Sequence, residues 1–183
     1  MILTAAVGLP LLGALALAVI PRWGEVSART FATLMALLSL LCLCLAWTRF
    51  EPSGELFQLI EEVPWVPGLG MAWRLGVDGI ALAVAAMSAL VFVASIVYPV
   101  DTKNRAAHYY AWLLFLQGVS LGVFLALDLL LFYVFFDLSL VGMFFLIGRW
   151  GHGERQVSAL KFFLYTFCGS LLMLLAFIGL YLP

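Results

Sequence analysis

Charge is scarce in this sequence. Only 10% of its 183 residues are Asp, Glu, Lys or Arg, whereas 66% are hydrophobic. Soluble domains carry roughly a quarter charged residues and about half apolar ones, so the composition excludes a water-soluble globular domain. The net charge of −1 gives no electrostatic reason to expect a nucleic-acid partner. Lipid solvates apolar surface of this extent, and the composition therefore predicts an integral membrane protein.

Cysteines and cofactor motifs are also scarce. The three cysteines, Cys42, Cys44 and Cys168, lie in apolar runs and form no CxxC pair. This pattern argues against a disulfide framework or a zinc site and favours small packing residues. The sequence has no Walker loop, dinucleotide fingerprint, haem motif or iron–sulfur cysteine set. We therefore expect no bound cofactor and no metal, so that any part in electron transfer is indirect.

Long apolar runs dominate the sequence. A transmembrane helix needs about 20 apolar residues. Six stretches qualify, at residues 2–20, 30–47, 78–98, 109–126, 129–150 and 157–182, with an outer loop at 49–77. The first stretch lacks a basic n-region, which favours a retained helix over a signal peptide. The sequence thus predicts an all-α fold, a polytopic transmembrane bundle of about six helices that forms a single membrane domain over residues 1–183.

The distribution of basic residues predicts the orientation of this bundle. Two of them, Arg49 and Arg74, border or lie in the loop at 49–77. The others lie in or beside the first, third and fifth loops: Arg22, Arg29, Lys103, Arg105, Arg149, Arg155 and Lys161. Cytoplasmic loops carry the excess of basic residues, so these three loops should face the cytoplasm. Both termini should then lie outside.

The segment between Arg49 and Val77 is the one non-apolar region. It contains four acidic residues together with several prolines and glycines. Proline and glycine favour turns over a helix, and we expect a solvated cap on the outer side. Trp65 and Trp73 are expected at the membrane interface, where tryptophan is enriched.

Asp137 is the clearest candidate for chemistry. It follows Leu129 by eight residues, which places it roughly 12 Å into a hydrocarbon core whose centre is about 15 Å deep. A charge at that depth costs about 2.5–3.5 kcal/mol on insertion scales. Desolvation favours the neutral carboxyl, while a nearby Lys or Arg favours the charged one. A group balanced between the two can take up and release protons; the alternative is a permanently protonated Asp in one interhelical hydrogen bond.

Other polar residues near the helices have more than one interpretation. Lys161 lies about one turn inside the last predicted helix, where its amine either snorkels to the headgroups or forms a relay partner inside the bundle. Tyr165 follows one turn later on the same face and extends such a path. Asp128 and Asp78 each precede a predicted helix, where a carboxylate caps the helix or suits its dipole.

Two parts of the sequence resemble a known family. Residues 61–70 (EEVPWVPGLG) and 75–80 (LGVDGI) resemble the outer loop and third-helix entry of the subunit M family of NADH-quinone oxidoreductase, respiratory complex I. Residues 122–137, 145–151 and 161–174 are similar to the fourth to sixth helices of the same family. The resemblance covers essentially the whole chain.

The resemblance implies an antiporter-like subunit of two inverted repeats. Proton transfer in this family is attributed to a glutamate on the fifth helix and to charged residues on the seventh, eighth and twelfth. Only the first position maps onto this sequence, at Asp137, whose side chain is one methylene shorter than the usual Glu. Gly142 stands where a proline is common. The sequence ends at Pro183, before the other positions, so a fragment, a split-gene product and an N-terminal piece that assembles with the rest all stay open.

The implied function is a non-redox, proton-translocating subunit in a bacterial plasma membrane, in contact with lipid and with the other membrane subunits of complex I. One alternative is a subunit of a multi-subunit cation/proton antiporter or membrane-bound hydrogenase, and another is an inert six-helix scaffold. The outer segment Glu61–Gly70 favours complex I. Neighbouring genes would discriminate among these.

Overall fold

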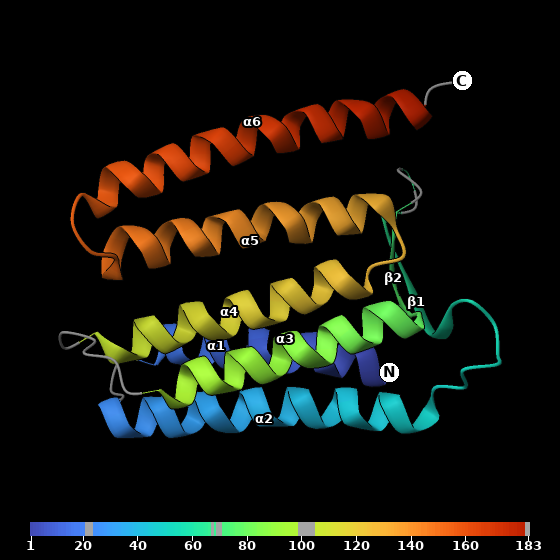
Figure 1. Ribbon diagram of the computed structural model, residues 1–183, viewed down its shortest axis with the longest axis horizontal. Helices are drawn as coiled ribbons and strands as arrows, with labels where there is room; N and C mark the ends of the chain where they lie inside the picture. The colour runs from blue at the N-terminus through green and yellow to red at the C-terminus, as the bar shows by residue number, and fades with distance from the viewer. Residues whose placement is uncertain (21–23, 67, 69–70, 99–104, 182–183) are drawn as a thin grey trace.

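The computed structural model describes residues 1–20, 24–66, 68, 71–98 and 105–181. Its helices and strands are α1 (Ile2–Val19), α2 (Glu25–Arg49), β1 (Gln58–Val66), β2 (Met71–Val77), α3 (Gly79–Val97), α4 (Ala106–Leu125), α5 (Leu129–Trp150) and α6 (Arg155–Tyr181). All six helices are long and apolar enough to cross a membrane, which confirms the expected transmembrane bundle. They lie side by side, and the start of α1 and the end of α6 are at the same end of the bundle as the strands (Figure 1).

Three helices begin earlier than the sequence predicted. α2 begins at Glu25 rather than at residue 30, α4 at Ala106 rather than at 109, and α6 at Arg155 rather than at 157. Hydropathy detects only the apolar part of a helix, whereas backbone hydrogen bonding continues into polar turns. At the start of α2, for example, the Ala28 amide donates to the Gly24 carbonyl at 2.9 Å.

α4 is the central helix, since it contacts α1, α2, α3 and α5. Two glycines allow close approach. A Cβ at Gly118 would lie 2.9 Å from the Val7 carbonyl oxygen, and one at Gly122 would lie 2.6 Å from the Phe135 ring. α6 lies at the edge of the bundle and packs against α5 (Figure 1).

Gly142 has a packing role in this chain. α5 continues unbroken past it. A Cβ at this position would lie 2.8 Å from Leu116 Cδ2. The missing side chain therefore lets α4 and α5 pack closely, and no kink is needed.

A proline inside α1 is compensated by a side chain from α2. Pro10 has no N–H, so the carbonyl of Ala6 loses its intrahelical partner. The buried Ser39 hydroxyl donates a 2.6 Å hydrogen bond to this carbonyl. The bond satisfies a group that would otherwise be unpaired in an apolar core, and it also fixes α2 against α1.

β1 and β2 form an antiparallel hairpin across the end of the bundle, in which Glu61 pairs with Leu75 and Val63 with Trp73. The sequence predicted turns and a solvated cap at this place, not strands. The cap is only partly solvated, because Leu75 and Val77 are fully buried. β2 also joins the α4–α5 connection, where the Leu127 amide donates to the Arg74 carbonyl at 2.9 Å.

Candidate functional site

Asp137 lies on the face of α5 that packs against α6. Phe144 and Gly148 follow it by seven and eleven residues and therefore share its face. The Phe144 ring lies 5.4 Å from the Phe163 ring of α6. A Cβ on Gly148 would lie 3.6 Å from the Cβ of Ala159. Asp137 is therefore an interhelical residue.

Two side chains with hydroxyl groups lie close to this carboxyl. Tyr133 precedes Asp137 by one turn on the same face, and its hydroxyl lies near both the Asp137 carboxyl and the Ser170 hydroxyl of α6. Ser170 is 2% exposed and donates to the Phe167 carbonyl at 3.2 Å. Asp137 Oδ1 is itself buried and has no hydrogen-bond partner among the described residues. The site thus combines one unpartnered carboxyl oxygen with two nearby hydroxyl groups, those of Tyr133 and Ser170.

The structure does not bring Lys161 or Tyr165 to this carboxyl. Both are exposed, Tyr165 at 86%. Lys161 is about 200° around α6 from Ala159, which faces α5. The contact between Phe144 and Phe163 also places Lys161 about two and a half turns, roughly 13 Å, from Asp137 along the helix axis. Within this chain, both side chains lie on the outer face of the bundle.

Sequence reasoning missed Tyr133 and Ser170. Tyr133 carried a usable signal, because a hydroxyl four residues before a membrane carboxylate lies on the same helix face. Ser170 carried none, since its proximity depends on how α6 is rotated against α5. These two residues take the place near Asp137 that Lys161 and Tyr165 were expected to occupy.

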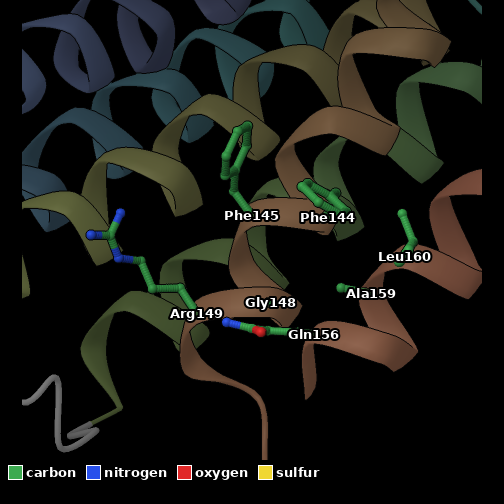
Figure 2. Close-up of a pocket in the computed structure, with 7 residues that line it drawn as sticks. All are labelled: Phe144, Phe145, Gly148, Arg149, Gln156, Ala159 and Leu160. Atoms are coloured by element: carbon green, nitrogen blue, oxygen red, sulfur yellow. The ribbon is translucent and has the colours of Figure 1, made fainter. Parts of the chain in front are cut away.

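A pocket of about 400 Å³ opens in the same α5–α6 interface, near the α5–α6 connection. It is lined by Phe144, Phe145, Gly148, Arg149, Gln156, Ala159 and Leu160 (Figure 2). Figure 2 shows the Arg149 guanidinium pointing away from Leu160, and this group lies 5.9 Å from the Trp150 ring centroid. The lining is mostly apolar, so the pocket is a recess beside Phe144 and not a polar binding site.

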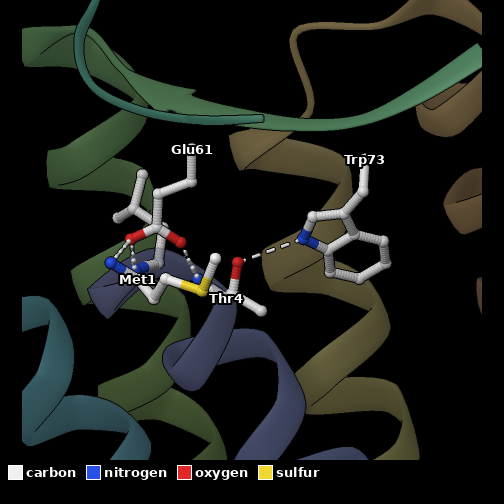
Figure 3. A network of polar contacts seen from close by, with 5 residues as sticks. Met1, Thr4, Glu61 and Trp73 are labelled. Carbon is white, nitrogen blue, oxygen red and sulfur yellow. Dashed lines mark hydrogen bonds and ion pairs between the residues drawn. The ribbon is translucent and has the colours of Figure 1, made fainter. Parts of the chain in front are cut away.

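At the opposite end of the bundle, Glu61 caps the first turn of α1 (Figure 3). Its carboxylate accepts hydrogen bonds from the amides of Leu3 at 3.0 Å and Thr4 at 2.8 Å, and forms a 2.7 Å ion pair with the Met1 amine. Burial of the Glu61 carboxyl raises its pKa. These bonds together lower the pKa by more than burial raises it, so the pKa of Glu61 lies below its ordinary value. The negative charge also suits the positive end of the helix dipole.

Trp73 connects the same turn of α1 to α5. Its indole N–H donates to the Thr4 hydroxyl at 3.1 Å (Figure 3). Its ring meets Phe135 edge-on. Trp65, in contrast, is 53% exposed. The hairpin therefore holds the start of α1 and the outer part of α5 in a fixed relation.

The acidic residues at the helix starts are caps, as the sequence indicated. Asp78 accepts from the Ala81 amide at 2.6 Å. Asp128 Oδ1 accepts from the amides of Leu130 at 2.9 Å and Leu131 at 3.0 Å. Its other oxygen accepts from Ala72 of β2 at 3.4 Å, which ties the hairpin to the start of α5.

The segment that contains Asp137 matches a known family. The profile of the NADH:quinone oxidoreductase/Mrp antiporter transmembrane family matches residues 126–182, which include α5, α6 and the link between them. This segment is therefore similar to the antiporter-like family. The match covers Tyr133, Asp137 and Ser170, so the whole candidate site lies in the antiporter-like segment.

The full chain is also similar to longer members of this group. It is 38% identical over 178 residues to NADH-quinone oxidoreductase subunit M of Rhodobacter capsulatus, covering 95% of this chain and 34% of the relative. It is 36% identical over 173 residues to NAD(P)H-quinone oxidoreductase chain 4 2 of Thermosynechococcus vestitus, covering 94% of this chain and 32% of the relative. The chain thus spans about a third of the length of these curated relatives.

A solved structure supports the same relationship. Superposition on a chain of respiratory complex I from Thermus thermophilus with bound NADH gives a TM-score of 0.79 at 28% sequence identity. The match covers 98% of this chain and 35% of that chain. The similarity therefore includes the hairpin of β1 and β2 as well as the antiporter-like segment.

Proposed function

We propose that this chain is part of a non-redox membrane subunit of an NADH-quinone oxidoreductase, in which quinone reduction elsewhere in the complex drives proton translocation past Asp137. The observation that carries the proposal is the position of Asp137 in the α5–α6 interface, with one oxygen buried and unpartnered among the described residues. The similarity to subunits of this oxidoreductase supplies the setting.

The physical reason lies in the energy of a buried carboxyl. An unpartnered oxygen in an apolar interface penalises the charged form, while a hydroxyl that donates to the carboxyl stabilises it. Asp137 Oδ1 is buried and unpartnered among the described residues, and the Tyr133 hydroxyl lies near the same carboxyl. A proton-relay residue requires a buried carboxyl with polar side chains close to it, and Asp137 meets this requirement.

The assembly and its membrane follow from the same proposal. The chain would contact the other membrane subunits of the complex along several helix faces, within a bacterial plasma membrane and with both termini outside. Accessibility labelling of single cysteines at Glu55 and Asn104 tests the orientation, although Asn104 lies outside the described residues. Labelling of Glu55 from the outside and of Asn104 from the cytoplasm is expected, and the reverse pattern would contradict it.

A second candidate is a subunit of a multi-subunit cation/proton antiporter, because the family that matches residues 126–182 includes Mrp antiporters. The similarity of nearly the whole chain, hairpin included, to subunit M favours the oxidoreductase. The identity of the neighbouring genes separates the two.

Substitution of Asp137 in the assembled complex tests the proposal. Asp137→Asn preserves size and hydrogen bonding but cannot change charge, so proton translocation per NADH oxidised should fall strongly. Reduction of an artificial acceptor by the NADH-oxidising module should be unaffected. Asp137→Glu keeps the titratable group and should retain most of the activity.

Asp128→Asn is the matched control, because it makes the same chemical change at a helix cap, where Asn serves nearly as well. Proton translocation by this variant should equal that of the unsubstituted complex. If Asp137→Asn also pumps normally at equal assembly level, Asp137 is a structural residue and the proposal fails.

A further inference from the structure

Gln117 is a polar side chain on α4, the central helix of the bundle, and it is 0% exposed. Its amide nitrogen donates to the Ala36 carbonyl of α2 at 3.4 Å, which is longer than the usual range for such a bond. Its amide oxygen, Oε1, is buried and has no hydrogen-bond partner among the described residues. A buried acceptor destabilises the fold unless a donor reaches it, so this oxygen indicates a ligand that can donate.

Three helices meet at the level of this amide. Ser39 lies one turn beyond the α2 carbonyl that Gln117 contacts, and its hydroxyl donates to the Ala6 carbonyl of α1 at 2.6 Å. α4 approaches α1 closely at the same level, since a Cβ at Gly118 would lie 2.9 Å from the Val7 carbonyl oxygen. The amide of Gln117 and the hydroxyl of Ser39 are therefore neighbours at the junction of α1, α2 and α4.

The hydrogen-bonding capacity of the two side chains identifies the chemistry of the ligand. A hydroxyl has one proton, and that of Ser39 is already donated to Ala6, so its oxygen can only accept a further bond. Gln117 Oε1 is also an acceptor. Two acceptors do not suit an anion. They also do not suit a hard cation, which takes six or more oxygen ligands, usually with carboxylates among them. A water molecule has two protons to donate and no charge, and it matches both oxygens.

We propose that Gln117 and Ser39 bind one internal water molecule, which donates one proton to Gln117 Oε1 and the other to Ser39 Oγ. The water would connect α4 to the pair formed by α1 and α2. A single water needs little room, and the side chains that meet here on α1 and α2, those of Ala6, Ala36 and Ser39, are small. The inference does not depend on the role of Asp137, because Gln117 faces α2 whereas Asp137 faces α6.

A density map of the assembled complex, at a resolution that shows ordered waters, tests the site directly. The expected result is a peak within about 3 Å of both Gln117 Oε1 and Ser39 Oγ. The peak should be missing in Gln117→Leu, which fills the position with an apolar side chain and removes one of the two acceptors. Ordered waters elsewhere in the same maps show that the resolution suffices.

A double-mutant cycle on thermal unfolding of the protein in detergent tests whether the water is shared. Gln117→Leu should lower the Tm by about 2–4 °C, the shift that loss of one typical hydrogen bond produces in a chain of this length. Ser39→Ala should lower the Tm less in the Gln117→Leu background than in the parent, because the water is already lost. Gln156→Leu is the matched control, since Gln156 is exposed on α6. It should leave the Tm unchanged and combine additively with Ser39→Ala.

The inference is overturned by a map that shows ordered waters elsewhere in the membrane interior but none between Gln117 and Ser39. Additive effects of Gln117→Leu and Ser39→Ala would overturn it equally, since one shared water must couple the two residues. If Gln117→Leu does not assemble, the map of the unsubstituted complex decides alone. Loss of proton translocation in Asp137→Asn bears only on the proposed function, so the two failures are distinguishable.

Discussion

The indole ring of Trp73 meets the phenyl ring of Phe135 edge-on, with 5.6 Å between the ring centroids and 71° between the planes. Phe135 precedes Asp137 by two residues on α5, and Trp73 also donates to Thr4 at the start of α1. One side chain of the outer hairpin therefore orders the helix turn next to the candidate proton site. This relation links the stability of the hairpin to the geometry of that site.

Substitution of Trp73 should separate its hydrogen bond from its packing. Trp73→Phe retains a ring near Phe135 but loses the indole N–H, and the free energy of unfolding should fall by about 0.5–1.5 kcal/mol. Trp73→Ala removes both and should cost more, about 3–5 kcal/mol for a well-packed aromatic ring. Chemical unfolding in detergent measures both values. Trp65→Phe is the control, and an equal loss there would contradict the assigned role of Trp73.

The cap formed by Glu61 should make stability depend on pH. The pKa of Glu61 is lowered in the folded chain, so its stabilising contribution is present above the unfolded value of about 4.3 and is lost as the pH falls through the folded pKa. Glu61→Gln should therefore reduce the free energy of unfolding by about 1–3 kcal/mol at neutral pH. The difference between variant and parent should shrink below about pH 4. The exposed Glu55→Gln should show neither effect; a difference that persists unchanged at low pH would argue against the cap.

The contact between Gly122 and Phe135 leaves no room for a methyl group. Gly122→Ala should destabilise the chain by about 1–3 kcal/mol, because α4 and α5 must separate or the Phe135 ring must turn. Gly169→Ala on α6 is the matched control, since a Cβ there has no neighbour within 4 Å among the described residues. Thermal unfolding of the two variants in detergent should differ in this order. Equal stability of both would show that α4 and α5 are not tightly packed at Gly122.

Pro10 and Ser39 should be energetically coupled. Ser39→Ala leaves the Ala6 carbonyl unpaired in the core and should cost about 1–3 kcal/mol. In a Pro10→Ala background, the restored N–H bonds to that carbonyl, and the same substitution should cost much less. A double-mutant cycle on the free energy of unfolding measures the coupling. Additive effects would mean that Ser39 acts independently of the proline.

The helices could be predicted from the sequence because their signal is local. An apolar run of sufficient length specifies a transmembrane helix whatever packs beside it. Asp137 was recognisable for the same reason, since its depth follows from its distance along the chain. The caps formed by Asp78 and Asp128 also rest on local spacing.

The partners of Asp137 could not be predicted in the same way. α6 is apolar around most of its circumference, so no polar stripe in its sequence indicates the side that faces α5. The sequence indicated Lys161 by its depth in the helix and Tyr165 by its spacing of one turn from Lys161. The structure instead places Ser170 on the buried side of α6 and Tyr165 on the exposed one. The hairpin was missed because paired glutamates and a proline interrupt the alternation that normally indicates a strand.

α6 differs from the other helices in how it is held. The hairpin fixes α1 and the start of α5, and α4 is enclosed on several sides. Among the described residues, α6 packs mainly against α5 and is joined to it by the short link at residues 151–154. This link lies at the end of the bundle opposite the hairpin (Figure 1). A neighbouring subunit that contacts the exposed side of α6 would widen or narrow the α5–α6 interface and leave the remaining helices in place. The carboxyl of Asp137 lies in that interface, so such a movement would change its solvation.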